Sequence, residues 1–295
     1  MNGGALALSE GVLFWGLDLG RGIVRAFDFD GRALGAGLDL GPASSVSGIV
    51  ADADRRVWVA DTRRGQLRGL NLFGYEGAEF VPEGGPLEAP GGGFSDGPVD
   101  VALAPGRELL GLWVALGGTR RGAVGLFLPD GTRLESLRSM GNPKLSFDRV
   151  TRLSGSGELL AVLETGEARV QVFRRGEFHF AFAPGHGRLR AVAVLVDGRF
   201  VVALGDDHAE RVVLFDAAVR EQRQLAPRPA NEGGGEARGV VDVVVDQQPS
   251  DAGSRLFLLD LEGTRVQVLN LKGRCYGAFA GFDAERDSEA IITDL

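Results

Sequence analysis

The stretch from Arg56 to Phe73, RVWVADTRRGQLRGLNLF, decides the fold because the chain repeats its pattern from end to end. It starts with VWVA at 57–60, a run of β-branched, aromatic and small residues that is typical of a strand buried on both faces. Asp61 and Thr62 follow, and such side chains bond nearby backbone groups and favour a turn. Residues 67–72 then follow a period of two, which indicates a second strand running back beside the first.

Five more copies of this pattern appear when the chain is aligned on the acid that ends the first strand and on the apolar residue nine positions later. Four copies keep an acid, namely Asp18, Glu164, Asp206 and Asp260, and one has Gly118 instead. An apolar strand precedes each pair and a weaker strand follows it, which makes four strands per unit. The units recur at a spacing near 42 residues, with two longer insertions, and this is the length of one propeller blade.

The repeat resembles that of a known family. Val-x-Val-Ala-Asp-Thr at 57–62, followed by an Arg-x-x-Val-type strand and a turn, is similar to the NHL repeat. The resemblance covers nearly the whole chain and implies an all-β fold, a six-bladed β-propeller of four-stranded antiparallel blades. We expect one domain over 1–282, with units at roughly 5–42, 46–82, 97–140, 145–185, 188–226 and 238–282. The remaining tail, 283–295, has the pattern of another inner strand that could close the ring.

Large rings recur three residues before the acid of the repeat. They are Trp15, Trp58 and Phe257, and Trp113 lies on the matching strand of the third unit. Aromatic side chains at a structural repeat position usually pack in the core. We therefore expect these rings to fill the wedges between adjacent blades.

The composition is ordinary for a soluble globular protein, since 44% of the 295 residues are hydrophobic and 24% are charged. The chain has neither a long apolar run nor a basic N-terminal region, so we expect no transmembrane helix and no signal peptide, and place the protein in the cytoplasm. The single cysteine, Cys275, excludes an intramolecular disulfide. Lys144 and Lys272 are the only lysines, which we interpret as the arginine-rich codon bias of a bacterial source.

The sequence contains no catalytic motif, so we expect no catalytic residue, no cofactor and no metal. The three histidines occupy positions that do not correspond between units, which argues against a zinc or copper site on the axis; they are His179, His186 and His208. No asparagine opens an inner strand, where the lactonases of related architecture place metal ligands.

Acids and arginines do occur together on the inner strands. Asp100 and Asp242 lie at matching positions of two units, and Arg149, Arg152 and Arg190 lie nearby on strands of the same class. We expect a channel whose charges neutralise each other, with a metal site as the alternative.

Arginines gather in the loops that join the two marked strands. Three of them lie five residues after a repeat acid, where an ion pair is expected: Arg169, Arg211 and Arg265. Arg63, Arg64, Arg120 and Arg121 have no such acid and form the candidate partner-binding face. Two Pro- and Gly-rich insertions, at 82–97 and 226–239, are expected on that same face.

These observations favour a non-enzymatic scaffold that binds a partner protein through the arginine-lined face. RNA binding by the same face, as some NHL proteins do, is one alternative, but the net charge of −8 counts against it. A calcium-dependent, lactonase-like hydrolase with a metal in the channel is the other.

Overall fold

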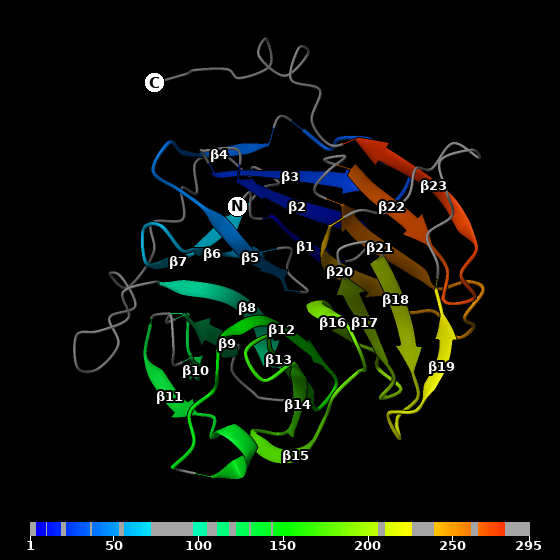
Figure 1. Cartoon of the computed structure of the whole chain (residues 1–295). Helices are drawn as coiled ribbons and strands as arrows, with labels where there is room; N and C mark the ends of the chain where they lie inside the picture. The colour runs from blue at the N-terminus through cyan, green and yellow to red at the C-terminus, as the bar shows by residue number, and fades with distance from the viewer. Residues whose placement is uncertain are drawn as a thin grey trace.

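The structure is a computed structural model that describes residues 4–9, 11–18, 22–35, 37–52, 56–71, 97–104, 111–117, 122–129, 131–142, 144–205, 210–225, 239–260 and 265–280. These residues form six antiparallel sheets arranged around a common centre, a six-bladed β-propeller (Figure 1). Five sheets have four strands each, and the second has three within the described residues. The expected all-β fold is therefore confirmed.

Each blade is built from strands that are consecutive in the sequence. Blades 1 and 2 contain β1 (Gly4–Ser9), β2 (Val12–Asp18), β3 (Gly22–Asp28) and β4 (Leu38–Gly41), then β5 (Val46–Ala51), β6 (Arg56–Asp61) and β7 (Gln66–Asn71). Blades 3 and 4 contain β8 (Pro98–Ala104), β9 (Gly111–Leu116), β10 (Ala123–Phe127) and β11 (Arg133–Ser136), then β12 (Val150–Ser156), β13 (Leu159–Glu164), β14 (Arg169–Arg174) and β15 (Glu177–Phe182). Blades 5 and 6 contain β16 (Arg188–Val194), β17 (Phe200–Gly205), β18 (Glu210–Phe215) and β19 (Glu221–Gln224), then β20 (Val240–Asp246), β21 (Arg255–Asp260), β22 (Arg265–Leu269) and β23 (Cys275–Ala280).

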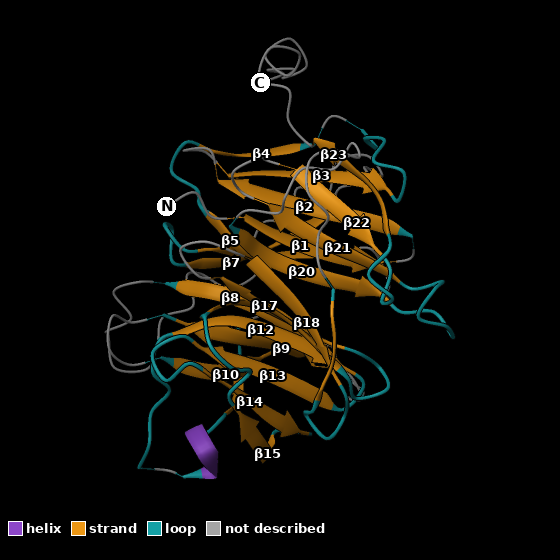
Figure 2. Cartoon of the chain, turned by 45° about the vertical axis from the view of Figure 1, so that its right-hand side comes forward, coloured by secondary structure: helices purple, strands orange, loops and turns teal. Residues whose placement is uncertain are grey.

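Helix is almost missing from the part of the chain that the structure describes. Figure 2 shows strands joined by loops, with one short helical turn at Ser139–Gly141. None of the described helical residues forms a segment long and apolar enough to cross a membrane.

The antiparallel order of the strands defines two faces of the disc. One face carries the loops between the second and third strands of each blade, for example the loop between β6 and β7. The inner strands begin at this same face, which we call the loop face. The turns between first and second and between third and fourth strands lie on the opposite face, which we call the hairpin face.

The core lies between blades rather than within one. Trp58 of β6 is 3% exposed and packs against Val101, Leu112 and Phe127 of blade 3. Trp113 packs in the same way against blade 4, and Phe257 packs against blade 1. The expectation that these rings fill the wedges between blades is confirmed.

One detail of that expectation is wrong, because Trp15 is not the equivalent of Trp58. Trp15 faces back toward Phe257 and Leu259 of blade 6, whereas Trp58 faces forward to the next blade. Phe14 is the residue of β2 that faces forward, against blade 2. Successive side chains of a strand point to opposite faces of the sheet, so the shift of one residue in the alignment reversed the direction of the ring.

The ring closes through packing between the first and last blades. The inner strands β1, β5, β8, β12, β16 and β20 contact one another in turn, and β20 also contacts β1. Side chains of both blades form one buried cluster at this seam, which includes Leu6, Trp15, Phe257 and Val266. The tail at 283–295, which could have closed the ring, lies outside the described residues, as do most of the two insertions.

Candidate functional site

The inner strands place one equivalent residue from each blade around the axis. In five blades the strand has a register shift just before this residue, which lies at the start of the strand near the loop face. The set is Gly48, Asp100, Arg152, Ala191 and Asp242, with Ala5 at the same position of β1. Three of the six positions are therefore charged, and the others are small.

Arg152 spans the axis from β12 to the blades on the other side. Its guanidinium donates to the carbonyl oxygen of Val241 in β20 at 3.0 and 3.1 Å, of Ser47 in β5 at 3.1 Å and of Gly4 in β1 at 3.2 Å. It also donates to its own neighbour, Thr151, at 3.0 Å. One side chain thus connects four blades through backbone acceptors, and a planar guanidinium with five donors is suited to this.

Asp100 and Asp242 each connect their own blade to the next one. Asp100 Oδ2 accepts from the backbone N–H of Leu153 at 2.7 Å, and Asp242 Oδ2 accepts from the N–H of Leu6 at 2.7 Å. The other carboxylate oxygen accepts in both cases from the residue that follows the acid, at 2.8 to 2.9 Å. The two acids therefore make the same bonds at two places in the ring, and a side chain at Gly48 would collide with Asp100.

The charges of this axial cluster, Arg152 with Asp100 and Asp242, partly compensate one another. Arg152 Nε lies 3.9 Å from Asp242 Oδ1, and both side chains are largely buried. Burial raises the pKa of Asp100 from 3.8 to about 7, while the positive charge of Arg152 works against that rise. Burial also raises the pKa of Asp242, again opposed by Arg152. The expected compensation between acids and arginine on the inner strands is therefore present in part at this end.

A pH-dependent stability follows from the raised pKa of Asp100. The folded protein binds the proton of the Asp100 carboxyl group more tightly than the unfolded chain does, because the pKa is about 7 in the folded state and about 4 in the unfolded state. Protonation of Asp100 therefore contributes fully to the free energy of unfolding below pH 4, and this contribution is lost as the pH rises to 7. An Asp100→Asn variant cannot ionise, so its free energy of unfolding minus that of the parent should rise by up to about 4 kcal/mol from pH 4 to pH 8, on top of a constant cost for the backbone N–H that the amide cannot accept. Urea unfolding at a series of pH values measures this difference.

The control for that measurement is Asp30→Asn, which removes an exposed carboxylate from a turn on the hairpin face. Its difference from the parent should stay nearly constant over the same range. A constant difference for Asp100→Asn as well would show that Asp100 is ionised in the folded protein throughout.

A cavity of about 220 Å³ continues along the axis from the two carboxylates toward the hairpin face. All six inner strands line it, and most of the lining side chains are apolar. Arg152 does not line this cavity and lies at its loop-face end.

The axial cluster does not fit a calcium ion. Both oxygens of Asp100 and of Asp242 already accept backbone N–H groups, and a guanidinium lies beside them. Calcium requires six to eight oxygen ligands, and a fixed positive charge next to the site repels a divalent cation. Across the described ranges no group of three or more His, Cys, Asp and Glu side chains is placed to hold a metal ion.

The repeat acids hold the segments that lead into the inner strands. Asp61 Oδ1 accepts from the N–H of Ser45 at 2.9 Å, and Glu164 Oε1 accepts from the N–H of Asp148 at 2.8 Å. The expected pair of Arg169 with Glu164 is confirmed, with Nε at 2.6 Å from the carboxylate. For Arg211 and Arg265 the side chains of the expected acids lie outside the described residues, and Arg211 lies 3.4 Å from Glu221.

The candidate partner-binding arginines are only half within the described residues. Arg63 and Arg64 are exposed in the loop between β6 and β7, while Arg120 and Arg121 lie outside the description. Arg63 donates to the carbonyl oxygen of Pro42 at 3.3 Å, and Arg64 lies 3.9 Å from Asp61. These contacts are weak, so both guanidinium groups remain accessible on the loop face.

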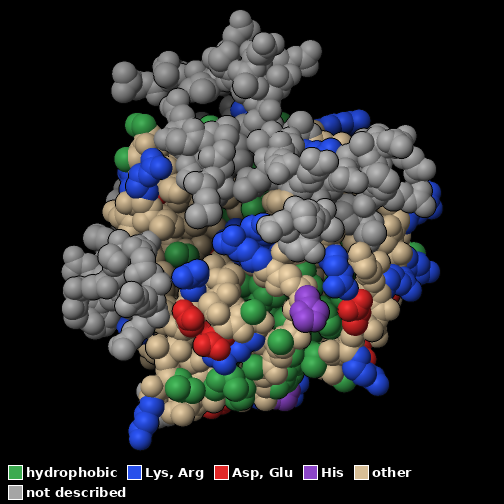
Figure 3. All heavy atoms as spheres, viewed as in Figure 1, with side chains coloured by type: hydrophobic (Ala, Val, Ile, Leu, Met, Phe, Trp, Pro, Cys, Tyr) green, Lys and Arg blue, Asp and Glu red, His purple; other side chains and the backbone are tan. Residues whose placement is uncertain are grey.

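Positive charge does not form one continuous field on the face seen in Figure 3. Arginine and lysine side chains occur there in separate groups, one of them near the middle, with acidic and hydrophobic side chains between them. Cys275 is half-buried on β23, and its Sγ lies 3.7 Å from the carbonyl oxygen of Gly277.

Comparison by sequence finds no matching family model and no matching curated protein. Comparison of structures finds many solved chains of similar fold. A gluconolactonase from Xanthomonas campestris is 17% identical over 88% of this chain and 82% of its own, with a TM-score of 0.58. A chain of the nidogen–laminin complex is 14% identical over 94% of both chains, with a TM-score of 0.60. A chain of hydrazine synthase from Kuenenia stuttgartiensis is 13% identical over 91% of this chain and 76% of its own, with a TM-score of 0.57.

Proposed function

We propose that this chain is a non-catalytic propeller scaffold of the NHL type, which binds an acidic surface of a partner protein on its loop face. At such low sequence identity the similar structures inform on the fold alone, and proteins with this fold perform unrelated functions. The proposal therefore rests on the side chains of this chain.

The observation that carries the proposal is the contrast between the axial cluster and the loop outside it. The acids and the arginine at the axis are committed to backbone groups of neighbouring blades, so they serve the fold. Arg63 and Arg64 lie on the same face with only weak contacts. Arginine is enriched at protein interfaces, where its guanidinium pairs with carboxylates in a bidentate manner.

A protein partner suits this face better than RNA does. The chain carries a net charge of −8, and single-stranded nucleic acid requires a positively charged groove with aromatic side chains for the bases. The loop that bears Arg63 and Arg64 has no aromatic residue between Asp61 and Leu72. A lactonase-like function would need a different axial site from the one that Arg152 occupies.

Charge reversal tests the proposed face. The tagged protein is used to capture partners from a lysate of the source organism, and bound proteins are identified by mass spectrometry. We expect Arg63→Glu/Arg64→Glu to reduce capture of the specific partner by at least about tenfold, because two attractive contacts become repulsive. The matched control is Arg32→Glu/Lys272→Glu, which makes the same change of charge in two turns of the hairpin face.

The control variant should capture the partner as the parent does. Retention of every captured protein by Arg63→Glu/Arg64→Glu would remove this loop from the interface and with it the proposed function.

A further inference from the structure

A second cavity, of about 240 Å³, lies at the seam where blade 6 meets blade 1. Phe29 and Asp30 reach it from the turn after β3, Arg255 from the start of β21, and Val268 from β22. The outer strand β23 supplies the remaining wall with Tyr276, Gly277, Ala278 and Phe279. The cavity opens near the hairpin face, away from Arg63 and Arg64, so a ligand bound in it would be independent of the proposed function.

The aromatic walls of this cavity are held in place from behind. Phe29 lies 5.0 Å from the buried ring of Phe257, and Phe279 lies 5.7 Å from Phe27. Phe279 also covers Gly31, where any side chain would collide with the ring. The hydroxyl of Tyr276 donates to the carbonyl oxygen of Ala252 at 2.7 Å. A binding site whose walls are already fixed loses little entropy when a ligand enters.

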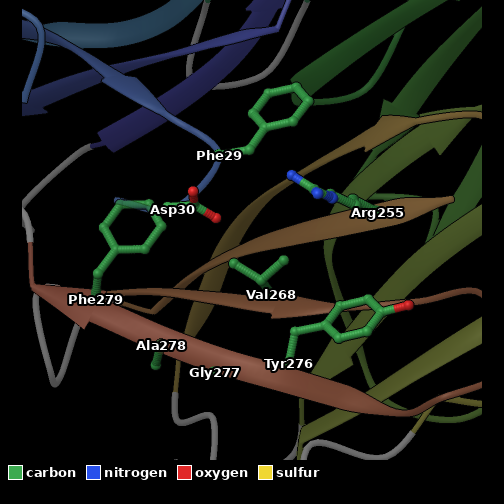
Figure 4. Close-up of a pocket in the computed structure, with 8 residues that line it drawn as sticks. All are labelled: Phe29, Asp30, Arg255, Val268, Tyr276, Gly277, Ala278 and Phe279. Atoms are coloured by element: carbon green, nitrogen blue, oxygen red, sulfur yellow. The ribbon is translucent and has the colours of Figure 1, made fainter. Parts of the chain in front are cut away.

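Two opposite charges face this cavity without pairing with each other. The guanidinium of Arg255 lies 5.2 Å from the centre of the Phe29 ring, and none of the ion pairs among the described residues includes it. The carboxylate of Asp30 is exposed and points toward the cavity beside Phe279 (Figure 4). Figure 4 also shows Val268 below these two charged groups and Tyr276 farther below.

We propose that this cavity binds a small zwitterion with an aromatic body, the chemistry of a free aromatic amino acid. The carboxylate of the ligand pairs with Arg255, its ammonium group pairs with Asp30, and its ring packs on Val268, Phe279 and Tyr276. A cation that is held over an aromatic ring keeps its donors directed outward for a carboxylate. The volume suits an aromatic amino acid, and apolar walls with a few placed charges are typical of small-molecule sites.

Calorimetric titration of the full chain with L-phenylalanine tests this proposal. We expect saturable binding that is at least about tenfold tighter than that of 3-phenylpropionate, which lacks the ammonium group, or of 2-phenylethylamine, which lacks the carboxylate. This comparison uses the unmodified protein, so it does not depend on the folding of any variant. If phenylalanine does not bind at about 10 mM, or if either analogue binds as tightly, the proposal is overturned.

Substitutions then assign the two charges. Arg255→Gln and Asp30→Asn should each weaken phenylalanine binding at least about tenfold, while thermal melts confirm that the variants are folded. Lys272→Gln, in the neighbouring turn between β22 and β23 but outside the lining, is the control and should bind as the parent does. Unchanged binding by Arg255→Gln would contradict the assigned site.

Discussion

Replacing Arg152 with methionine should lower the free energy of unfolding by more than about 3 kcal/mol at pH 7. Methionine replaces the unbranched aliphatic part of the side chain but leaves the carbonyl oxygens of Gly4, Ser47 and Val241 without their donor. It also leaves two largely buried carboxylates without a counter-ion. Removing one partner of a buried ion pair is far more destabilising than replacing both partners with well-packed apolar residues, because it leaves a buried charge uncompensated.

The dependence of this loss on pH separates it from a simple packing defect. Arg152 lowers the pKa of both Asp100 and Asp242, so its removal raises both values further. The destabilisation should therefore be smaller at pH 5, below the pKa of about 7 of Asp100, than at pH 8. Urea unfolding of the parent and of Arg152→Met at both pH values measures the effect.

A matched control comes from Arg149, which precedes the same strand and is exposed. Arg149→Met should change the free energy of unfolding by less than about 0.5 kcal/mol. An Arg152→Met variant that unfolds like this control would mean that the axial hydrogen bonds contribute nothing to the ring.

Trp58→Ala is expected to lower the free energy of unfolding by about 3–5 kcal/mol. Trp58 is 3% exposed between blades 2 and 3, and its loss leaves a cavity next to Val101, Leu112 and Phe127. The close packing of the inter-blade layer prevents neighbouring sheets from collapsing into the space. Chemical unfolding followed by circular dichroism measures the change.

Trp58→Phe provides the graded comparison. It keeps an aromatic ring in the wedge and should cost roughly 1–2 kcal/mol. Equal and small losses for both substitutions would contradict the burial of Trp58 between blades.

The period-two pattern and its repetition were enough to predict the architecture. VWVA at 57–60 and its copies carry the information for buried strands locally, and the spacing between copies gives the size of a blade. The pair of Glu164 and Arg169 was predictable for the same reason, since residues on adjacent strands of one hairpin are close in sequence. The first unit shows the limit of this reasoning, because an error of one residue placed Trp15 on the wrong side of its sheet.

The hydrogen-bond partners of the axial cluster could not be predicted from the sequence. Asp100 and Asp242 could be matched by position, but their bonds reach Leu153 and Leu6, which lie 53 and 236 residues away. The acceptors of Arg152 are carbonyl oxygens, and the cavity at the seam joins residues from the two ends of the chain. Backbone groups are the same in every residue, so no pattern of side chains marks the ones that will bind. Local hydrogen bonding and side-chain alternation thus determine the blades from sequence, whereas closure of the ring decides which distant groups meet.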